Sequence, residues 1–102
     1  MQPFLLEKQA SIAEICRKHH VQRLFVFGSA ARDDFDPARS DVDLLVEFEP
    51  GYIPRSHWLK LDMEGELEEV LQRKIDLLTS SSLRNPYLIR QINSDRQALY
   101  GA

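Results

Sequence analysis

The segment "FGSAARDDFDPARSDVDLLVEF" (Phe27–Phe48) combines the pattern of a buried strand with a high density of charge, since it holds five aspartates and two arginines. Aspartate is a poor strand former, yet Asp41 and Asp43 stand where the apolar run begins. Residues i and i+2 of a strand point to the same face, so both carboxylates share one face while Val42 and Leu44 enter the core.

Two parallel carboxylates this close repel each other and need a cation or a proton between them. A hard cation with oxygen ligands, Mg²⁺ above all, meets that need. The alternative is a polar strand start in which Asp41 caps a turn.

The Gly28-Ser29 pair, which precedes the two aspartates, favours a functional interpretation of their carboxylates. The apolar run "RLFVF" (Arg23–Phe27) predicts a buried strand, and "AARD" after the pair could form one helical turn. Backbone N–H groups and a hydroxyl at a helix N-terminus bind phosphate oxygens, and glycine lets a phosphate approach the backbone. The lysine of a Walker A loop and the further glycines of a dinucleotide-binding loop are missing. A simple turn is the alternative.

Asp76 adds a third carboxylate inside the apolar stretch "KIDLLT" (Lys74–Thr79). If this strand lies beside the Asp41 strand, three carboxylates could converge on two metal ions. Two such ions stabilise the attacking and leaving oxygens of an in-line phosphoryl transfer. Considered alone, Asp76 could equally be a polar residue of an edge strand.

Composition predicts one domain over residues 1–102, because the length suits one modest core and the chain is 43% hydrophobic and 28% charged. The apolar runs are too short for a membrane span, and the N-terminus shows no signal-peptide pattern, so we expect a cytoplasmic protein. A net charge of -3 argues against direct nucleic-acid binding. Cys16, the only cysteine, excludes an internal disulfide and is expected in the core.

Hydrophobic periodicity predicts an α/β fold, a small mixed β-sheet packed with helices. The expected helices cover Leu5–His19, His57–Arg73 (with Ser56 as its N-cap) and Asn85–Ser94, and the expected strands cover Arg23–Phe27, Asp41–Phe48, Lys74–Thr79 and Arg96–Tyr100. Gly65 lies inside the second helix without an evident reason.

The order Gly-Ser, eleven residues, Asp-x-Asp and a later strand aspartate resembles the nucleotidyltransferase superfamily that includes DNA polymerase β. Together with "ELEEVLQRKIDLLT", the segment Phe27–Phe48 most resembles the minimal nucleotidyltransferase (MNT) family over nearly the whole chain. The resemblance implies a polymerase β-like core. One departure is Asp33, which stands where the family commonly has a second glycine before Asp34. Aspartate can adopt left-handed backbone geometry at modest cost, but the extra negative charge near a triphosphate could slow catalysis.

The resemblance also implies the roles of the site residues. Asp41, Asp43 and Asp76 would be catalytic and would bind two Mg²⁺ ions. Nucleotide binding would fall to Gly28, Ser29, Arg32, Arg39 and Ser40, with ATP as substrate. For Arg32 and Arg39, which flank the loop expected to face the triphosphate, a solvated loop arginine is the alternative.

MNT proteins commonly pair with HEPN RNase toxins in two-component toxin–antitoxin systems, and members act by transferring AMP to a tyrosine of the toxin. We therefore expect a Mg²⁺-dependent adenylyltransferase antitoxin that forms a complex with a HEPN-type toxin. A chain of this length leaves no room for a domain that grips a primer or a tRNA, which favours a protein acceptor. The alternatives are an antitoxin that acts by binding alone and a nucleotidyltransferase with another acceptor, such as a small molecule.

Overall fold

The computed structural model describes residues 2–32, 36, 41–52 and 57–101, and for residues 57–60 and 81 it describes the backbone alone. It contains a four-stranded mixed sheet in the order β3-β2-β1-β4. The strands are β1 (Val21–Phe27), β2 (Val42–Phe48), β3 (Ile75–Thr79) and β4 (Gln97–Tyr100). Strand β1 is antiparallel to both β2 and β4, whereas β2 and β3 are parallel. The predicted α/β fold with a small mixed sheet is confirmed.

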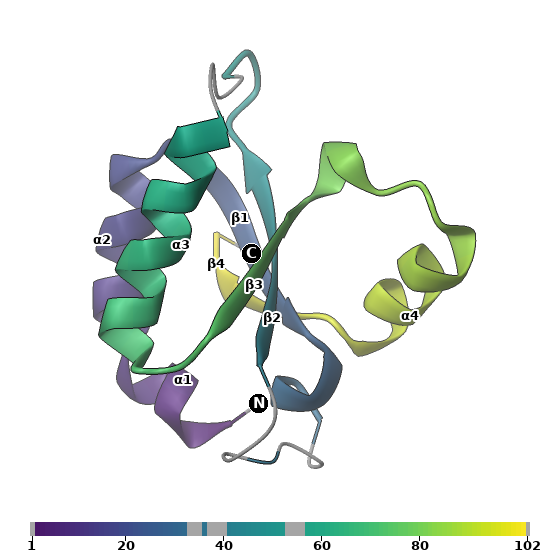
Figure 1. Ribbon diagram of the computed structural model, residues 1–102, viewed down its shortest axis with the longest axis horizontal. Coiled ribbons are helices and arrows are strands. Elements are labelled where there is room, and N and C mark those ends of the chain that lie inside the picture. Colours follow the sequence, from purple (N-terminus) through teal and green to yellow (C-terminus); the bar gives the residue numbers. More distant parts are fainter. Residues whose placement is uncertain (1, 33–35, 37–40, 53–56, 102) are drawn as a thin grey trace.

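Helices cover the two faces of the sheet unequally (Figure 1). On one face lie α1 (Pro3–Glu7), α2 (Gln9–Lys18) and α3 (His57–Leu71), and on the other lies α4 (Pro86–Asp95). Two single turns of 3₁₀ helix, η1 (Gly28–Ala30) and η2 (Ser80–Ser82), follow β1 and β3. None of these described helices combines the length and the apolar character needed to cross a bilayer.

The alternation of the strands produces two hydrophobic clusters, one on each face. The larger cluster joins the sheet to α1, α2 and α3 through residues such as Leu5, Ile12 and Leu44. The smaller cluster, on the α4 side, is built from Phe25, Phe27, Leu45 and Ile92. Since Asp43 is two residues before Leu45 in β2, its side chain belongs to the α4 side of the sheet.

The first predicted helix is in fact two helices. Pro3 begins α1, as its fixed φ suits the first turn of a helix. The chain then leaves helical geometry at Lys8, where ψ is 12°, and α2 begins at Gln9. The buried positions Leu5, Ile12 and Cys16 nevertheless all reach the larger cluster. Cys16 is fully buried, which confirms its predicted place in the core, and this burial raises the pKa of its thiol to about 12.

The other predicted elements match the structure within about two residues, and the predicted helix start at Asn85-Pro86 is confirmed in detail. The side chain of Asn85 accepts a hydrogen bond from the backbone N–H of Tyr87 at 2.9 Å, and Pro86 is the first residue of α4. Ser56, the predicted cap of α3, lies outside the described residues.

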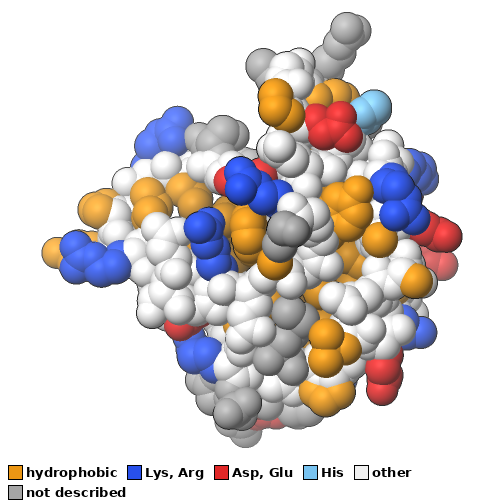
Figure 2. Space-filling view, turned by 180° about the vertical axis from the view of Figure 1, so that it is seen from behind, with side chains coloured by type: hydrophobic (Ala, Val, Ile, Leu, Met, Phe, Trp, Pro, Cys, Tyr) orange, Lys and Arg blue, Asp and Glu red, His pale blue; other side chains and the backbone are white. Residues whose placement is uncertain are grey.

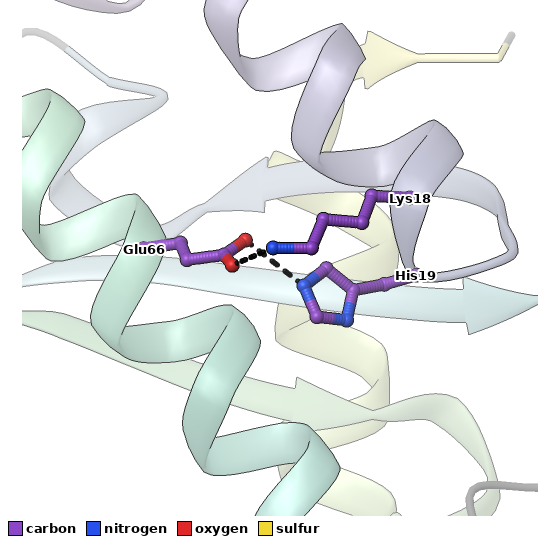
Figure 3. A network of polar contacts seen from close by, with 3 residues as sticks. All are labelled: Lys18, His19 and Glu66. Carbon is purple, nitrogen blue, oxygen red and sulfur yellow. Dashed lines mark hydrogen bonds and ion pairs between the residues drawn. The ribbon is translucent and has the colours of Figure 1, made fainter.

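A polar network ties the end of α2 to α3 on the side away from α4 (Figure 3). Lys18 Nζ lies 2.5 Å from Glu66 Oε1, and His19 Nε2 lies 2.9 Å from Glu66 Oε2. The hydrogen bond from Lys18, more than that from His19, holds the pKa of Glu66 below its usual value.

On the rear face of the molecule, Lys and Arg side chains stand among hydrophobic and uncharged ones (Figure 2).

We predict that Gly65→Ala stabilises the protein. A Cβ at this position of α3 would meet no atom within 4 Å, and a helix-interior glycine costs about 1 kcal/mol relative to alanine. Denaturant titration should show the free energy of unfolding rising by about that amount.

Gly101→Ala is the matched control and should destabilise the fold. Gly101 has a φ of +73°, and a Cβ there would collide with the backbone oxygen of Gln22. A lower free energy of unfolding for Gly65→Ala would contradict the prediction, because it would show that this position of α3 does not accommodate a Cβ.

Candidate active site

The parallel pairing of β2 with β3 sets the geometry of the candidate site. In this register Asp43 is the direct partner of Asp76, and Val42 pairs with Ile75. On its other side Asp43 is the partner of Phe27, the last residue of β1. Two carboxylates from different strands therefore meet beside the end of a third strand, on the sheet face that carries α4.

The turn after β1 passes close to Asp43. Gly28 has a φ of +69°, and a Cβ on it would lie 2.6 Å from Asp43 Oδ2. Only glycine tolerates this backbone conformation at no steric cost while letting the carboxylate come so near. Gly28 thus allows the turn after β1 to lie against the Asp43 carboxylate, which is more than the role of a simple turn.

The helix expected after Gly28-Ser29 is a single 3₁₀ turn, η1. The N–H groups of Ala31 and Arg32 both donate to the Gly28 carbonyl oxygen, at 3.1 and 3.2 Å. A turn this short adds little helix dipole, so phosphate binding here would depend on individual N–H groups and on nearby cations.

A cavity of about 470 Å³ lies over these residues. It is lined by residues of β1 and η1, by Arg32, by both strand carboxylates and by α4: Phe27, Gly28, Ser29, Arg32, Asp43, Asp76, Leu78, Leu88 and Gln91. Its apolar wall and its carboxylates together suit a molecule with a flat apolar part and an anionic part bridged by a cation. A second cavity of about 580 Å³, between the end of α2 and α3, contains none of these residues.

The electrostatics of the site centre on Asp43. Burial raises its pKa to about 6, and the charges of Asp76 and Asp41 add to this effect, while Arg32 opposes it. Asp43 and Asp41 are half-buried, and Asp76 is exposed. The site therefore concentrates negative charge that a proton or a cation would relieve.

The carboxylate oxygens of Asp43 and Asp76 fit a hard cation. They lie on two paired strands, next to Gly28, which has no side chain to fill the space. Among the described residues, no three His, Cys, Asp or Glu side chains converge tightly enough to hold one metal ion as they stand. Ionised carboxylates with no cation between them repel, which favours such separation. The two-metal site with Asp41, Asp43 and Asp76 remains a prediction.

The predicted nucleotide-binding residues divide into two groups. Gly28, Ser29 and Arg32 line the cavity. Arg39 and Ser40, like the unusual Asp33, lie outside the described residues. Sequence reasoning did not anticipate Leu88 and Gln91 of α4 as lining residues, because nothing local in α4 indicates which sheet face it covers.

Comparison with known proteins agrees with this geometry. The sequence pattern of the nucleotidyltransferase domain family matches residues 10–99. The chain belongs to this family. A relative from Methanocaldococcus jannaschii, "Putative protein adenylyltransferase MJ0126", is 34% identical over 94 residues, which cover 84% of this chain and 92% of the relative. The chain is thus a nucleotidyltransferase by family, and the resemblance inferred from the sequence is confirmed.

Solved structures share the fold of this nucleotidyltransferase. A structure described as a "putative minimal nucleotidyltransferase" is 30% identical, with a TM-score of 0.73 and coverage of 91% of this chain and 90% of that one. A chain from the complex of a tri-AMPylated Shewanella oneidensis HEPN toxin with its MNT antitoxin has a TM-score of 0.68 at 18% identity, covering 96% of this chain and 73% of that one. The second likeness is one of fold alone.

The raised pKa of Asp43 predicts a pH-dependent effect of Asp43→Asn in metal-free buffer. The folded-state pKa, about 6, exceeds the ordinary value of 3.8, so the fold favours the protonated form. Stability contributed by this preference is complete below about pH 4 and is lost as the pH rises through 6. The neutral asparagine avoids this loss, so near pH 7 the variant should be more stable by roughly 1 kcal/mol, after allowance for solvent screening.

Chemical denaturation with a chelator present, at both ends of this pH range, measures the difference. The variant and the wild type should agree below about pH 4 apart from a constant offset. A difference in the free energy of unfolding that does not change with pH would show that Asp43 is an ordinary surface carboxylate.

Proposed function

We propose that this nucleotidyltransferase is a Mg²⁺-dependent adenylyltransferase that moves AMP from ATP to a tyrosine hydroxyl of a HEPN-type RNase toxin and thereby neutralises it. One observation carries the proposal: Asp43 faces Asp76 across parallel strands, against Gly28, in a cavity of nucleotide size. The name of the M. jannaschii relative supports AMP transfer to a protein. One chain of the HEPN–MNT complex shares the fold of this protein, which supports a toxin as the partner.

In this proposal each element of the site has a definite role. Asp41, Asp43 and Asp76 would hold the metal ions. Bound there, Mg²⁺ would neutralise the triphosphate and stabilise the attacking and leaving oxygens. Ser29 and the backbone of η1 contact the phosphates, and the apolar wall of Leu78 and Leu88 faces the base.

The transfer is a substitution at the α-phosphorus of ATP. The tyrosine oxygen forms a bond to this phosphorus, and the bond from the phosphorus to the bridging oxygen of the β-phosphate breaks. Pyrophosphate leaves, and the tyrosine proton passes to Asp76, the most exposed of the three carboxylates. The rigid strands hold the donor half of the reaction, and the toxin brings its own hydroxyl.

Neutralisation follows from the chemistry of the product. An attached AMP adds a negative charge and bulk to the toxin. Near an RNase active site, the added charge repels the phosphates of the RNA substrate, and the bulk excludes them. Contact between the proteins is then needed only for the transfer itself.

The test is the intact mass of the purified HEPN-type partner toxin after incubation with the chain, ATP and Mg²⁺. The mass should increase by one or more AMP units while RNase activity falls in parallel. The variant Asp41→Asn/Asp43→Asn should give no added mass, because it removes the charges that hold the metal without removing core packing.

Asp62→Asn is the matched control, since Asp62 is an exposed carboxylate of α3, far from the cavity of Asp43 and Asp76. It should transfer AMP like the wild type. Neutralisation without added mass, or equal neutralisation by the double variant, would show that the chain acts by binding alone.

A further inference from the structure

An ion pair at the edge of the cavity joins two parts of the chain that are far apart in sequence. Arg32 Nη1 lies 2.5 Å from Asp95 Oδ2, and Asp95 is the last residue of α4. The Asp95 side chain is only 15% exposed, whereas that of Arg32 is 41% exposed. Asp95 is therefore the more buried of the two partners.

The backbone next to Arg32 is held in place without Asp95. The side chain of Gln2 donates a hydrogen bond to the carbonyl oxygen of Arg32 at 3.1 Å. The backbone N–H of Gln2 donates another to the carbonyl oxygen of Ala30, also at 3.1 Å. Gln97, at the start of β4, donates to the Ala31 carbonyl oxygen at 3.1 Å. The contact with Asp95 consequently adds little to the path of the main chain and acts on the Arg32 side chain.

Arg32 is subject to two opposing attractions. It lines the cavity together with Asp43 and Asp76, and its charge is felt at Asp43. A guanidinium drawn onto those two carboxylates would occupy the place of a cation. Asp95, the last residue of α4, competes with those two carboxylates for the same guanidinium.

We propose that Asp95 is a positioning residue that holds the Arg32 guanidinium at the edge of the cavity, away from the strand carboxylates, where it meets the phosphate tail of the nucleotide. Guanidinium carries five donors in a planar fork, so a carboxylate on one nitrogen is compatible with phosphate contact by the others. The inference rests on the proposed function, because it concerns how that site takes its nucleotide.

The stability of the fold should depend little on this pair. Ion pairs with a partner this exposed contribute little to folding, and Ile92 and the stacking of Arg96 over the ring of Phe25, at 4.7 Å, also anchor the end of α4. An effect of Asp95→Asn on nucleotide binding without an effect on thermal unfolding would thus separate positioning from a structural role.

The experiment is a double-mutant cycle on the affinity for ATP in the presence of Mg²⁺, measured by calorimetry. Asp95→Asn should weaken binding roughly tenfold, as expected for loss of one well-placed charged hydrogen bond. On an Arg32→Ala background the same change should have no further effect, because Asp95 acts through Arg32. Asp62→Asn, the matched loss of one carboxylate, should leave the affinity unchanged.

Three results would overturn the proposal in distinguishable ways. Unchanged affinity in Asp95→Asn would show that the ion pair does not position Arg32 for the nucleotide. Equal weakening on both backgrounds would show that Asp95 acts through the fold. A wild-type chain that does not bind ATP with Mg²⁺ would overturn the proposed function, and this inference with it.

Discussion

The constraint on which the site depends is the register of the parallel pair β2–β3. Because Asp43 is paired with Asp76, a shift of one residue would turn one of the two carboxylates to the opposite face. The buried residues Val42, Leu44 and Val46 of the larger cluster oppose such a shift, since a slip of β2 by one residue would turn them out of the core. The hydrophobic pattern of β2 thus places the charges as well as the core.

The same register brings like charges together, which is electrostatically unfavourable unless a proton or a cation lies between them. Asp43 is half-buried against Gly28, with two further carboxylates near enough to raise its pKa. A fold selected only for stability would place an asparagine or an apolar residue here. A site for a cation and an anionic nucleotide requires such a cluster of like charges beside a cavity. The cluster therefore agrees with membership of the nucleotidyltransferase family.

Local sequence predicted the strands from their hydrophobic alternation. It predicted that Asp43 and Asp76 meet only on the condition that their strands are neighbours, and the pairing of β2 with β3 fulfils that condition. It missed the break at Lys8, where no glycine or proline marks the end of α1. It could not predict the pairing of Arg32 with Asp95, since these residues are 63 positions apart and meet only because α4 covers the face opposite α1, α2 and α3. Contacts set by such long-range packing leave no local pattern.

The central claim is that the carboxylates of β2 and β3 bind nucleotide through a cation, and calorimetric titration with ATP tests it most directly. The account predicts binding to the wild type with Mg²⁺ and loss of that binding when a chelator removes the metal, because an uncompensated carboxylate cluster repels a triphosphate. It also predicts weaker binding in Asp76→Asn, because that variant lacks one of the proposed metal ligands. Equal affinity for ATP with and without a divalent cation would contradict it.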